Sequence, residues 1–283
     1  MRPIVRSLLA ALLIAIVGAR HFRAQDPPPP DPLRFAVIGD NGTGDRFEYE
    51  VAAQMVASRQ RFPFELVLML GDNIYGGQSP KDFVQKFEAP YRPLLEAGVR
   101  FYASLVNHDK QNNRLYQPFN MGGERYYTFA RKNVRFVVLD SDYLDPRQLV
   151  WVDEALRSSS DEWKICYFHH PLYSNGGRHG SQVDLRVLLE PLFVKYGVNV
   201  VFSGHDHIYE RLKPQRGIQY FVSGAAGQVR KGDLRRSEMT AAAFDQDQSF
   251  MLVEIAASDL SFQAISRTGT VVDSGVLHKE PRP

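Results

Sequence analysis

The chain has 283 residues, of which 44% are hydrophobic and 23% charged, and its formal net charge is +2. This length suits one large or two small globular domains with ample core. Because the charge is nearly balanced, it gives no electrostatic reason to expect a surface that binds nucleic acid or an anionic membrane. No run of basic residues with interleaved aromatic residues is present either.

Residues 1–24 have the pattern of a secretory signal. Arg2 and Arg6 precede the apolar stretch SLLAALLIAIVGA, which is too short to span a bilayer comfortably. We predict cleavage after Ala19 or Ala24, and therefore a secreted or periplasmic protein. Two arginines just beyond the apolar run leave an uncleaved membrane anchor as the alternative.

Residues 25–32 contain DPPPPDP, which predicts a stiff polyproline spacer ahead of one folded domain at 33–283. Cys166 is the only cysteine, so no disulfide can form within the chain. Because it lies in the apolar run KICYF, we predict a buried, inert thiol rather than a nucleophile. The domain must therefore be held together by its core.

Strand-like and helix-like segments alternate through the first two thirds of the domain. The strand-like runs are RFAVIGD, ELVLMLGD, VRFYASLVN, VRFVVLD, WKICYFH and VNVVFSGH, which end at Asp40, Asp72, Asn107, Asp140, His169 and His205. Three amphipathic helices are predicted between these runs. The first has apolar residues at Phe47, Val51 and Met55, and the second has them at Leu149, Val152 and Leu156 after the N-cap pair Asp145 and Pro146. The third has them at Leu185, Leu188, Leu189 and Leu192 and should stop at Gly197. The alternation indicates an α/β fold with a mostly buried sheet. After Gly217 the segments IQYFVSGAAG, SFMLVEIA and DLSFQAISRTGTVVDSGVL predict a second set of strands packed against the first.

Polar side chains stand where the predicted strands end, which is where open α/β sheets build their sites. Five of these positions are Asp40, Asp72, Asn107, His169 and His205. Five of the eight histidines also lie in the strand-end segments, namely His108, His169, His170, His205 and His207. Carboxylates, an amide oxygen and imidazoles are ligands for two adjacent hard or borderline cations, and a carboxylate can bridge them. A single zinc ion would need only three or four ligands, so we predict a two-metal site.

Five short motifs follow one another in this order: GDNG at 39–42, GDNIY at 71–75, NHD at 107–109, HHP at 169–171 and GHDH at 204–207. Together they resemble the motif set of the metallophosphoesterases, and specifically of the purple acid phosphatases of the small, tartrate-resistant type. The resemblance implies a four-layer α/β/β/α sandwich of two mixed sheets flanked by helices. Calcineurin-like relatives carry a ligand histidine where this chain has Gly42, and the second motif here supplies Tyr75 instead.

The same resemblance implies a ligand set. Asp40, Tyr75 and His207 would hold Fe(III), which a phenolate ligand favours. Asn107, His169 and His205 would hold a divalent partner, which could be iron, zinc or manganese, and Asp72 would bridge the two ions. His169 rather than His170 matches the family pattern, so His170 would be a neighbouring residue at the rim.

Two further histidines would lie at the substrate. His108 follows Asn107 and could protonate a leaving oxygen. His179 in NGGRHG resembles a family loop histidine that contacts phosphate, and an exposed loop histidine without a role is the alternative. The family usually has Gly where this chain has Val106, and if that position needs a positive φ the loop must run differently.

These features predict a secreted acid phosphatase in which a metal-bound hydroxide attacks a phosphate monoester, while the cations, Asn107 and histidines neutralise charge. A phosphodiesterase or nucleotide pyrophosphatase with the same metals is one alternative, and a non-catalytic secreted module whose metals brace the fold is another. We expect a small phosphate ester as substrate, no nucleic-acid partner, no membrane association unless the N-terminal segment is retained, and a monomer.

Overall fold

The computed structural model describes residues 31–106 and 108–279, which lie in one compact unit. The predicted signal, most of the spacer and Asn107 lie outside these residues. Within the described part of the chain, no helix is long and apolar enough to cross a membrane.

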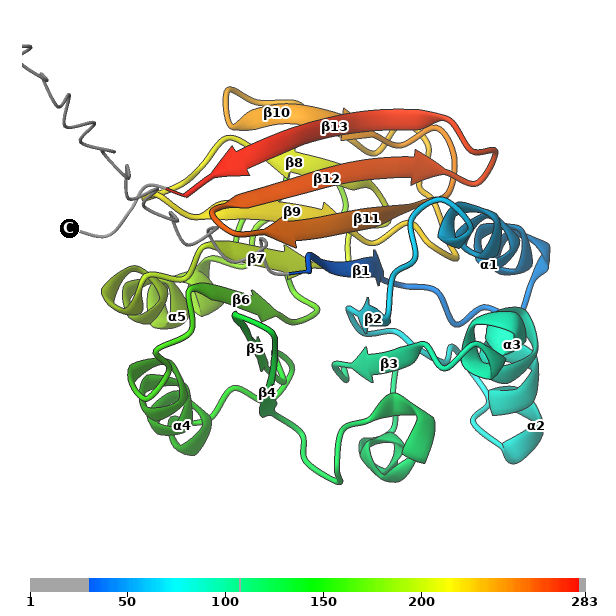
Figure 1. Ribbon diagram of the computed structural model, residues 1–283, viewed down its shortest axis with the longest axis horizontal. Coiled ribbons are helices and arrows are strands. Elements are labelled where there is room, and N and C mark those ends of the chain that lie inside the picture. Colours follow the sequence, from blue (N-terminus) through cyan, green and yellow to red (C-terminus); the bar gives the residue numbers. More distant parts are fainter. Residues whose placement is uncertain (1–30, 107, 280–283) are drawn as a thin grey trace, which may run out of the picture. The chain divides into compact units, whose positions relative to one another are not determined.

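Two mixed sheets form the centre of the fold (Figure 1). The six-stranded sheet has the order β13-β12-β11-β1-β2-β3, with bounds Val271–His278, Asp259–Ser266, Ser249–Ala256, Leu33–Ile38, Leu66–Met69 and Arg100–Ala103. The seven-stranded sheet has the order β10-β8-β9-β7-β6-β5-β4, with bounds Thr240–Phe244, Tyr209–Leu212, Gln219–Ser223, Val200–Ser203, Trp163–Tyr167, Val134–Val138 and Tyr127–Arg131. Strands β1, β2 and β3 run parallel to one another in the first sheet, as β5, β6, β7 and β9 do in the second.

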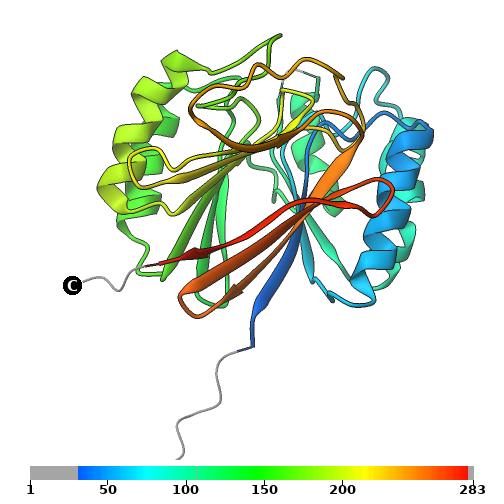
Figure 2. The ribbon, with the colours of Figure 1, turned by 90° about the horizontal axis from the view of Figure 1, so that it is seen from above.

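Helices cover the outer face of each sheet, so the predicted four-layer sandwich is confirmed. The helices are α1 (Arg46–Arg59), α2 (Pro80–Phe83), the π-helix η1 (Val84–Glu88), α3 (Ala89–Glu96), the 3₁₀ turns η2 (Gln111–Leu115) and η3 (Gln117–Phe119), α4 (Pro146–Arg157) and α5 (Val183–Tyr196). Figure 2 shows the blue and cyan helices on one side of the sheets and the green helices α4 and α5 on the other.

Three apolar clusters separate the four layers. Strand β1 shows why, because Phe35 and Val37 face the core between the sheets while Ala36 and Ile38 face the helices. Both faces of the strand are buried, which explains its nearly continuous apolar sequence. The third cluster lies between the second sheet and helices α4 and α5. Cys166 is buried in that cluster, as predicted.

The predicted helix ends are confirmed. The Asp145 carboxylate accepts a hydrogen bond from the backbone N–H of Gln148 at the start of α4, with Pro146 as the first helical residue. Helix α5 ends at Tyr196 and is capped by Gly197, whose φ is +65°. This left-handed conformation at the end of a helix is one that glycine adopts without a steric penalty.

Two predicted core positions are wrong. Phe47 is 40% exposed and Leu188 is 45% exposed, although both fit an apolar periodicity. Adjacent helical residues point about 100° apart, so only one of each neighbouring pair can face the sheet. Glu48 and Leu189 take the inward places, and the Glu48 carboxylate accepts the backbone N–H of Gly44.

Candidate metal centre

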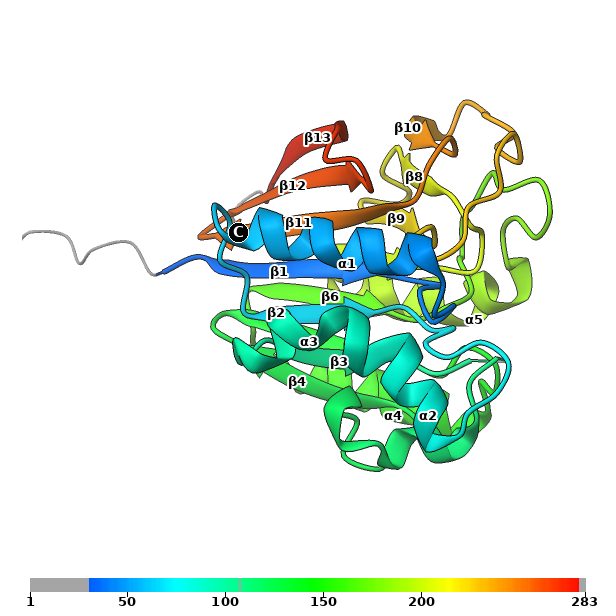
Figure 3. The same ribbon diagram turned by 90° about the vertical axis from the view of Figure 1, so that its right-hand side faces the viewer.

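The predicted strand ends from both sheets meet at one side of the fold. Figure 3 shows β1 and β2 running toward the right of the view, where long loops gather. Asp40 and Asp72 follow β1 and β2 of the first sheet, while His169 and His205 follow β6 and β7 of the second. The site therefore forms where the carboxyl ends of the two sheets come together.

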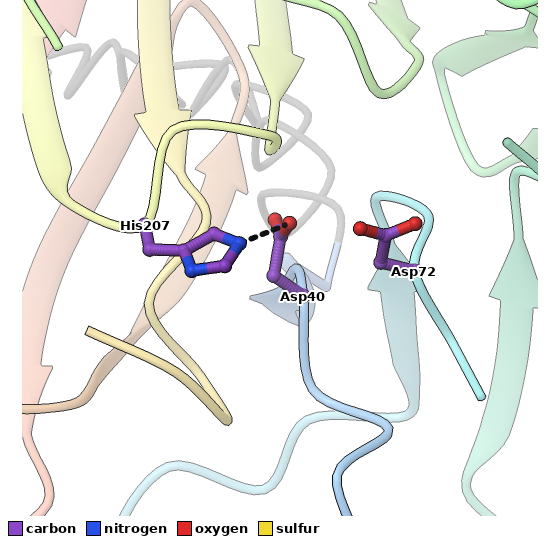
Figure 4. A group of neighbouring side chains, drawn as sticks. All are labelled: Asp40, Asp72 and His207. Carbon is purple, nitrogen blue, oxygen red and sulfur yellow. Dashed lines mark ion pairs between the residues drawn. The ribbon is translucent and has the colours of Figure 1, made fainter. Parts of the chain in front are cut away.

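Asp40 lies at the centre of the first group of polar atoms, between His207 and Asp72 (Figure 4). Its Oδ1 is 3.3 Å from His207 Nε2 and 3.2 Å from the Tyr75 hydroxyl, and that hydroxyl is 3.3 Å from His207 Nε2. Ligand atoms of Asp40, Asp72 and His207 all lie within 4.8 Å of one another, and the three side chains are buried. One cation could be bound by this group.

His169 and His205 form a second group beside the first. His169 Nδ1 lies 2.9 Å from the Leu70 carbonyl oxygen, which can only accept, so Nδ1 carries the proton. Burial lowers the pKa of His169 to about 4, so the ring is neutral and Nε2 keeps a lone pair. That Nε2 lies 3.0 Å from His205 Nδ1 and 3.6 Å from Asp72 Oδ2. A hydrogen bond from the distal ring nitrogen to a carbonyl is the usual support for a metal-ligating histidine.

The residues fit a pair of cations. Asp40 and Asp72 are both buried, yet among the described residues only histidines lie within ion-pair distance of their carboxylates. Asp72 Oδ1 is also buried without a hydrogen-bond partner in this part of the chain. Buried carboxylates without a cation are costly, which is why burial raises the pKa of Asp72. Cations between the two groups would remove that cost.

Tyr75 supports the same conclusion. Burial, followed by the Asp40 and Asp72 carboxylates, raises the pKa of Tyr75 far above its usual range. Without a cation the side chain is a neutral phenol, whereas a bound trivalent ion would reverse the local charge and favour the phenolate.

Three of the residues predicted as ligands have a left-handed backbone. The φ angles are +54° at Asp40, +53° at Asp72 and +71° at His205. Such angles are uncommon outside glycine, and each costs on the order of 1 kcal/mol or more. The His205 N–H donates to Asp40 Oδ2 at 2.8 Å, so the turn is held by another residue of the site.

No side chain fits at position 42. A Cβ added to Gly42 would lie 1.9 Å from the carbonyl oxygen of Asn73. The Gly42 carbonyl accepts the backbone N–H of Tyr75 at 2.8 Å, so the second motif packs directly on the first. Gly42 cannot be exchanged for a ligating residue unless this loop moves.

The loop after β3 carries His108 without strain at Val106. Val106 is buried, and it is absent from the positive-φ residues of the described chain, so the concern about a β-branched residue there does not arise. His108 is exposed, and its ring centroid lies 5.0 Å from that of Tyr75. The structure thus places His108 at the open rim of the Asp40 group.

Two other predicted histidines border His205. The ring of His179 lies 4.1 Å from the His205 ring, and that of His170 lies 4.4 Å from it. His170 Nδ1 is 2.9 Å from the Ser141 hydroxyl, so this nitrogen is engaged by a neighbouring side chain. His179 is exposed to solvent, so it could contact a substrate.

Asp109 was not singled out from the sequence, although it belongs to the NHD motif. Its carboxylate accepts the backbone N–H groups of Asn73 and Ile74 at 3.1 and 3.2 Å and the Asn73 side-chain amide at 2.9 Å. Asp109 therefore fixes the segment between Asp72 and Tyr75.

Asp206 is a second positioning residue that sequence reasoning missed, although it stands between two predicted ligands in GHDH. Its carboxylate accepts the Ser174 hydroxyl at 2.6 Å and the Gly180 N–H at 3.1 Å. These bonds hold both ends of the loop that carries His179. Its place between His205 and His207 in the motif could have identified Asp206 as a residue of the site from the sequence.

The chain is similar to known proteins in sequence and in fold. The family model for the calcineurin-like phosphoesterases matches residues 33–209. Tartrate-resistant acid phosphatase type 5 of Rattus norvegicus is 24% identical over 306 residues, which cover 90% of this chain and 93% of the rat protein. Purple acid phosphatase 3 of Arabidopsis thaliana is 30% identical over 269 residues, which cover 81% of this chain and 73% of the plant protein.

Two solved structures share the fold. A purple acid phosphatase from yellow lupin seeds superposes with a TM-score of 0.75 at 19% identity, covering 88% of this chain and 54% of the lupin chain. This chain therefore spans about half the length of the lupin enzyme. GAP50, described as the anchor in the inner membrane complex of Plasmodium, also gives 0.75 at 18% identity, covering 89% and 90% of the two chains.

Proposed function

Because this chain belongs to the calcineurin-like phosphoesterase family and, within it, to the purple acid phosphatases, which have a binuclear metal centre, we propose that it hydrolyses phosphate monoesters where its two sheets meet. The family makes it a metal-dependent phosphoric monoester hydrolase that acts on small phosphate esters. The observation that carries the proposal is the arrangement of His169 and His207 around the buried Asp40 and Asp72 carboxylates, which have no lysine or arginine partner in the described chain.

The ligands divide into two groups. Asp40, Tyr75 and His207 would hold Fe(III), and Asp72 would be shared. The second, divalent ion of iron, zinc or manganese would be held by Asn107, His169 and His205. Imidazole, carboxylate and phenolate donors suit these ions. When bound, the ions would supply positive charge against the phosphoryl oxygens and a water of lowered pKa.

The chain's own residues would do the rest. Leu70 holds His169 in the tautomer that presents Nε2. His179 would donate to a phosphoryl oxygen from its place over the His205 ring. His108, exposed at the rim beside Tyr75, would give a proton to the leaving oxygen.

A direct test compares p-nitrophenyl phosphate with bis(p-nitrophenyl) phosphate on purified protein whose metal content has been measured. We expect clear preference for the monoester, and a loss of about 100-fold or more in Asp72→Asn. Asp259→Asn is the matched control, because Asp259 is partly exposed at the start of β12 and pairs with His278. Preference for the diester would support a phosphodiesterase. No hydrolysis of either compound with two metals bound would support a non-catalytic module.

Secretion is the remaining part of the proposal, and it depends on the sequence of residues 1–24. The mature protein should lack at least residues 1–19 and be found outside the cytoplasm. Intact-mass measurement decides this, and a cytoplasmic chain that still begins at Met1 would contradict it.

A further inference from the structure

Helix α5 has an apolar outer side. Val183, Val187, Leu188, Pro191 and Val194 are exposed, and the exposed fraction reaches 66% at Val187. With about 3.6 residues per turn, these five side chains fall within an arc of about 140° around the helix. We call this set the α5 face. A surface helix normally carries polar and charged residues on its outer side, and a contiguous exposed apolar face is typical of an interaction site.

Helix α4 extends this apolar surface. Val150 on α4 is 71% exposed. A groove of about 490 Å³ lies between the two helices, and its apolar lining is formed by Leu149, Val150, Val187, Leu188, Pro191 and Leu192. Figure 2 shows α4 and α5 in green on the outer side of the sheets, away from the blue and cyan helices. A further helix packed on this surface would cover the α5 face and fill part of the groove.

Two charged residues flank the α5 face. Asp184 lies in the first turn of α5 and Lys195 in its last turn, and both are exposed. Both fall within the arc of the apolar side chains. Lys195 Nζ pairs with Asp153 on α4 at 3.0 Å, yet the Lys195 side chain stays 59% exposed and can bind a second carboxylate. The outer side of α5 therefore has an acid at its start, a base at its end and apolar residues between them.

This order of charges is complementary to a second copy of itself. In an antiparallel pair of α5 helices related by a twofold axis, Asp184 of each copy lies beside Lys195 of the other copy. The same register places Leu188 of each copy beside Pro191 of the other, because both pairs are centred between residues 189 and 190. The two helix dipoles also oppose each other, with each positive end beside a negative end.

A membrane surface fits the α5 face less well. Helices that lie on membranes carry lysine and arginine along the border of the apolar side, with Trp, Phe or Leu within it. Here the border includes the acidic residues Asp153, Glu154 and Asp184, and the α5 face consists of valine, leucine and proline. The charges therefore favour a second copy of the chain over an anionic lipid surface.

We propose that two copies of this chain form a twofold dimer by antiparallel packing of their α5 faces. The dimer does not depend on the proposed hydrolysis, and it would replace the monomer expected from the sequence. Only α5 and the adjoining edge of α4 take part in each copy. The interface is therefore small and the affinity modest, with a Kd on the order of 10 µM.

Sedimentation equilibrium of the purified protein between about 1 and 300 µM covers the range in which such a Kd is measurable. The wild type should pass from monomer to dimer as its concentration rises. Val187→Glu should raise Kd about 100-fold or more, because each copy would bury an unpaired carboxylate in the interface. Val271→Glu is the matched control, because Val271 is an exposed valine of β13 outside the α5 face, and it should leave Kd unchanged.

Charge reversal tests the antiparallel register. Asp184→Lys places like charges beside each other at both ends of the interface, and so does Lys195→Glu, so each variant alone should raise Kd about 10-fold. A one-to-one mixture of the two variants should associate as the wild type does, because the mixed dimer pairs opposite charges at both ends. Thermal melting followed by circular dichroism verifies that each variant keeps its fold.

Five results would overturn the inference. The first is a wild type that stays monomeric at the highest concentration. A dimer that Val187→Glu does not weaken would be held by another surface or by residues 1–24. Equal weakening by Val271→Glu would show a general effect of added charge, and failure of the mixture to associate would contradict the antiparallel pairing. Finally, a monomer that binds vesicles of phosphatidylcholine and phosphatidylglycerol, and loses this binding in Val187→Glu, would assign the α5 face to a membrane.

Discussion

The backbone N–H of Tyr75 donates to the carbonyl oxygen of Gly42 at 2.8 Å. This bond joins the residue proposed as phenolate ligand to the position where calcineurin-like relatives carry a ligand histidine. Between them, Asn73 passes so close to Gly42 that a Cβ would lie 1.9 Å from its carbonyl oxygen. The presence of Tyr75 in the site and the absence of a side chain at position 42 are therefore parts of one arrangement.

Gly42→Ala should destabilise the protein by about 3 kcal/mol, the upper part of the usual range for overpacking, because the contact is with backbone that cannot rotate away. Urea unfolding of the chelator-treated protein measures it. Gly217→Ala is the control, since Gly217 has φ +83° but nothing within 4 Å of an added Cβ, and should cost only about 1 kcal/mol. Equal costs would mean that the loop over Gly42 adjusts freely.

Tyr75→Phe should remove the visible charge-transfer band of iron-loaded protein while leaving the fold intact. The hydroxyl oxygen is the only heavy atom removed, and the proposed phenolate ligand of Fe(III) would be the source of the colour. Absorption spectra with parallel iron analysis provide the measurement. Tyr143→Phe is the control, because Tyr143 is exposed and stacks with Arg125. An active, colourless protein without iron in every redox state would contradict the ferric assignment.

His108→Ala should lower turnover of alkyl phosphate monoesters by about 100-fold or more and cost much less on activated aryl esters. An alkoxide needs a proton as it departs, whereas a nitrophenolate is already a stable anion. Steady-state kinetics with both substrate types and metal analysis test this. His278→Ala, at the exposed end of β13, should change neither rate.

Equal loss on both substrate types with metals retained would make His108 a phosphate-binding residue rather than an acid. Equal loss with metals gone would make it a support for the metal site.

His170 should make the metal-free protein less stable in acid. Burial, and next the charge of His179, lower the pKa of His170 to about 4, whereas the unfolded value is about 6.5. Between pH 4 and pH 6.5 the His170 side chain binds more protons in the unfolded state than in the folded state. The free energy of unfolding is therefore highest above pH 6.5 as far as His170 is concerned, and it decreases as the pH falls toward 4. Burial and Asp72 raise the pKa of Asp109 to about 8, which acts in the opposite direction.

A difference measurement therefore isolates His170. The Tm of His170→Asn minus that of the wild type, both treated with chelator, should become more positive from pH 7 to pH 5. A constant difference would show that His170 titrates alike in the folded and unfolded states.

Much of the fold was predictable because the parallel strands are buried on both faces and end in polar residues. Asp40, Asp72, His169 and His205 follow their strands as expected. Asp140 also follows a strand, but it pairs with Arg125 at 2.7 Å, so a strand-end carboxylate alone does not define the site. The five sequence motifs and their order separate the strand-end residues of the site from Asp140.

Other features depend on contacts between distant segments. No periodicity predicts α3, because Pro90 and Pro93 interrupt its apolar pattern. Strand β4 was missed because only its pairing with β5 makes it a strand, and its side chains are not fully buried. Arg230 lies 23 positions beyond His207, yet its backbone N–H donates to the His207 carbonyl oxygen at 3.0 Å, a contact that no local sequence pattern predicts.

The left-handed turns at Asp40, Asp72 and His205 bear on laboratory evolution of this protein. Glycine would relax each turn while deleting a residue of the site. Libraries selected only for heat resistance should therefore accumulate glycine at these three positions and become steadily more robust and less active. Selection has to reward turnover and thermal survival together, or the variants that melt last will be the ones that no longer work.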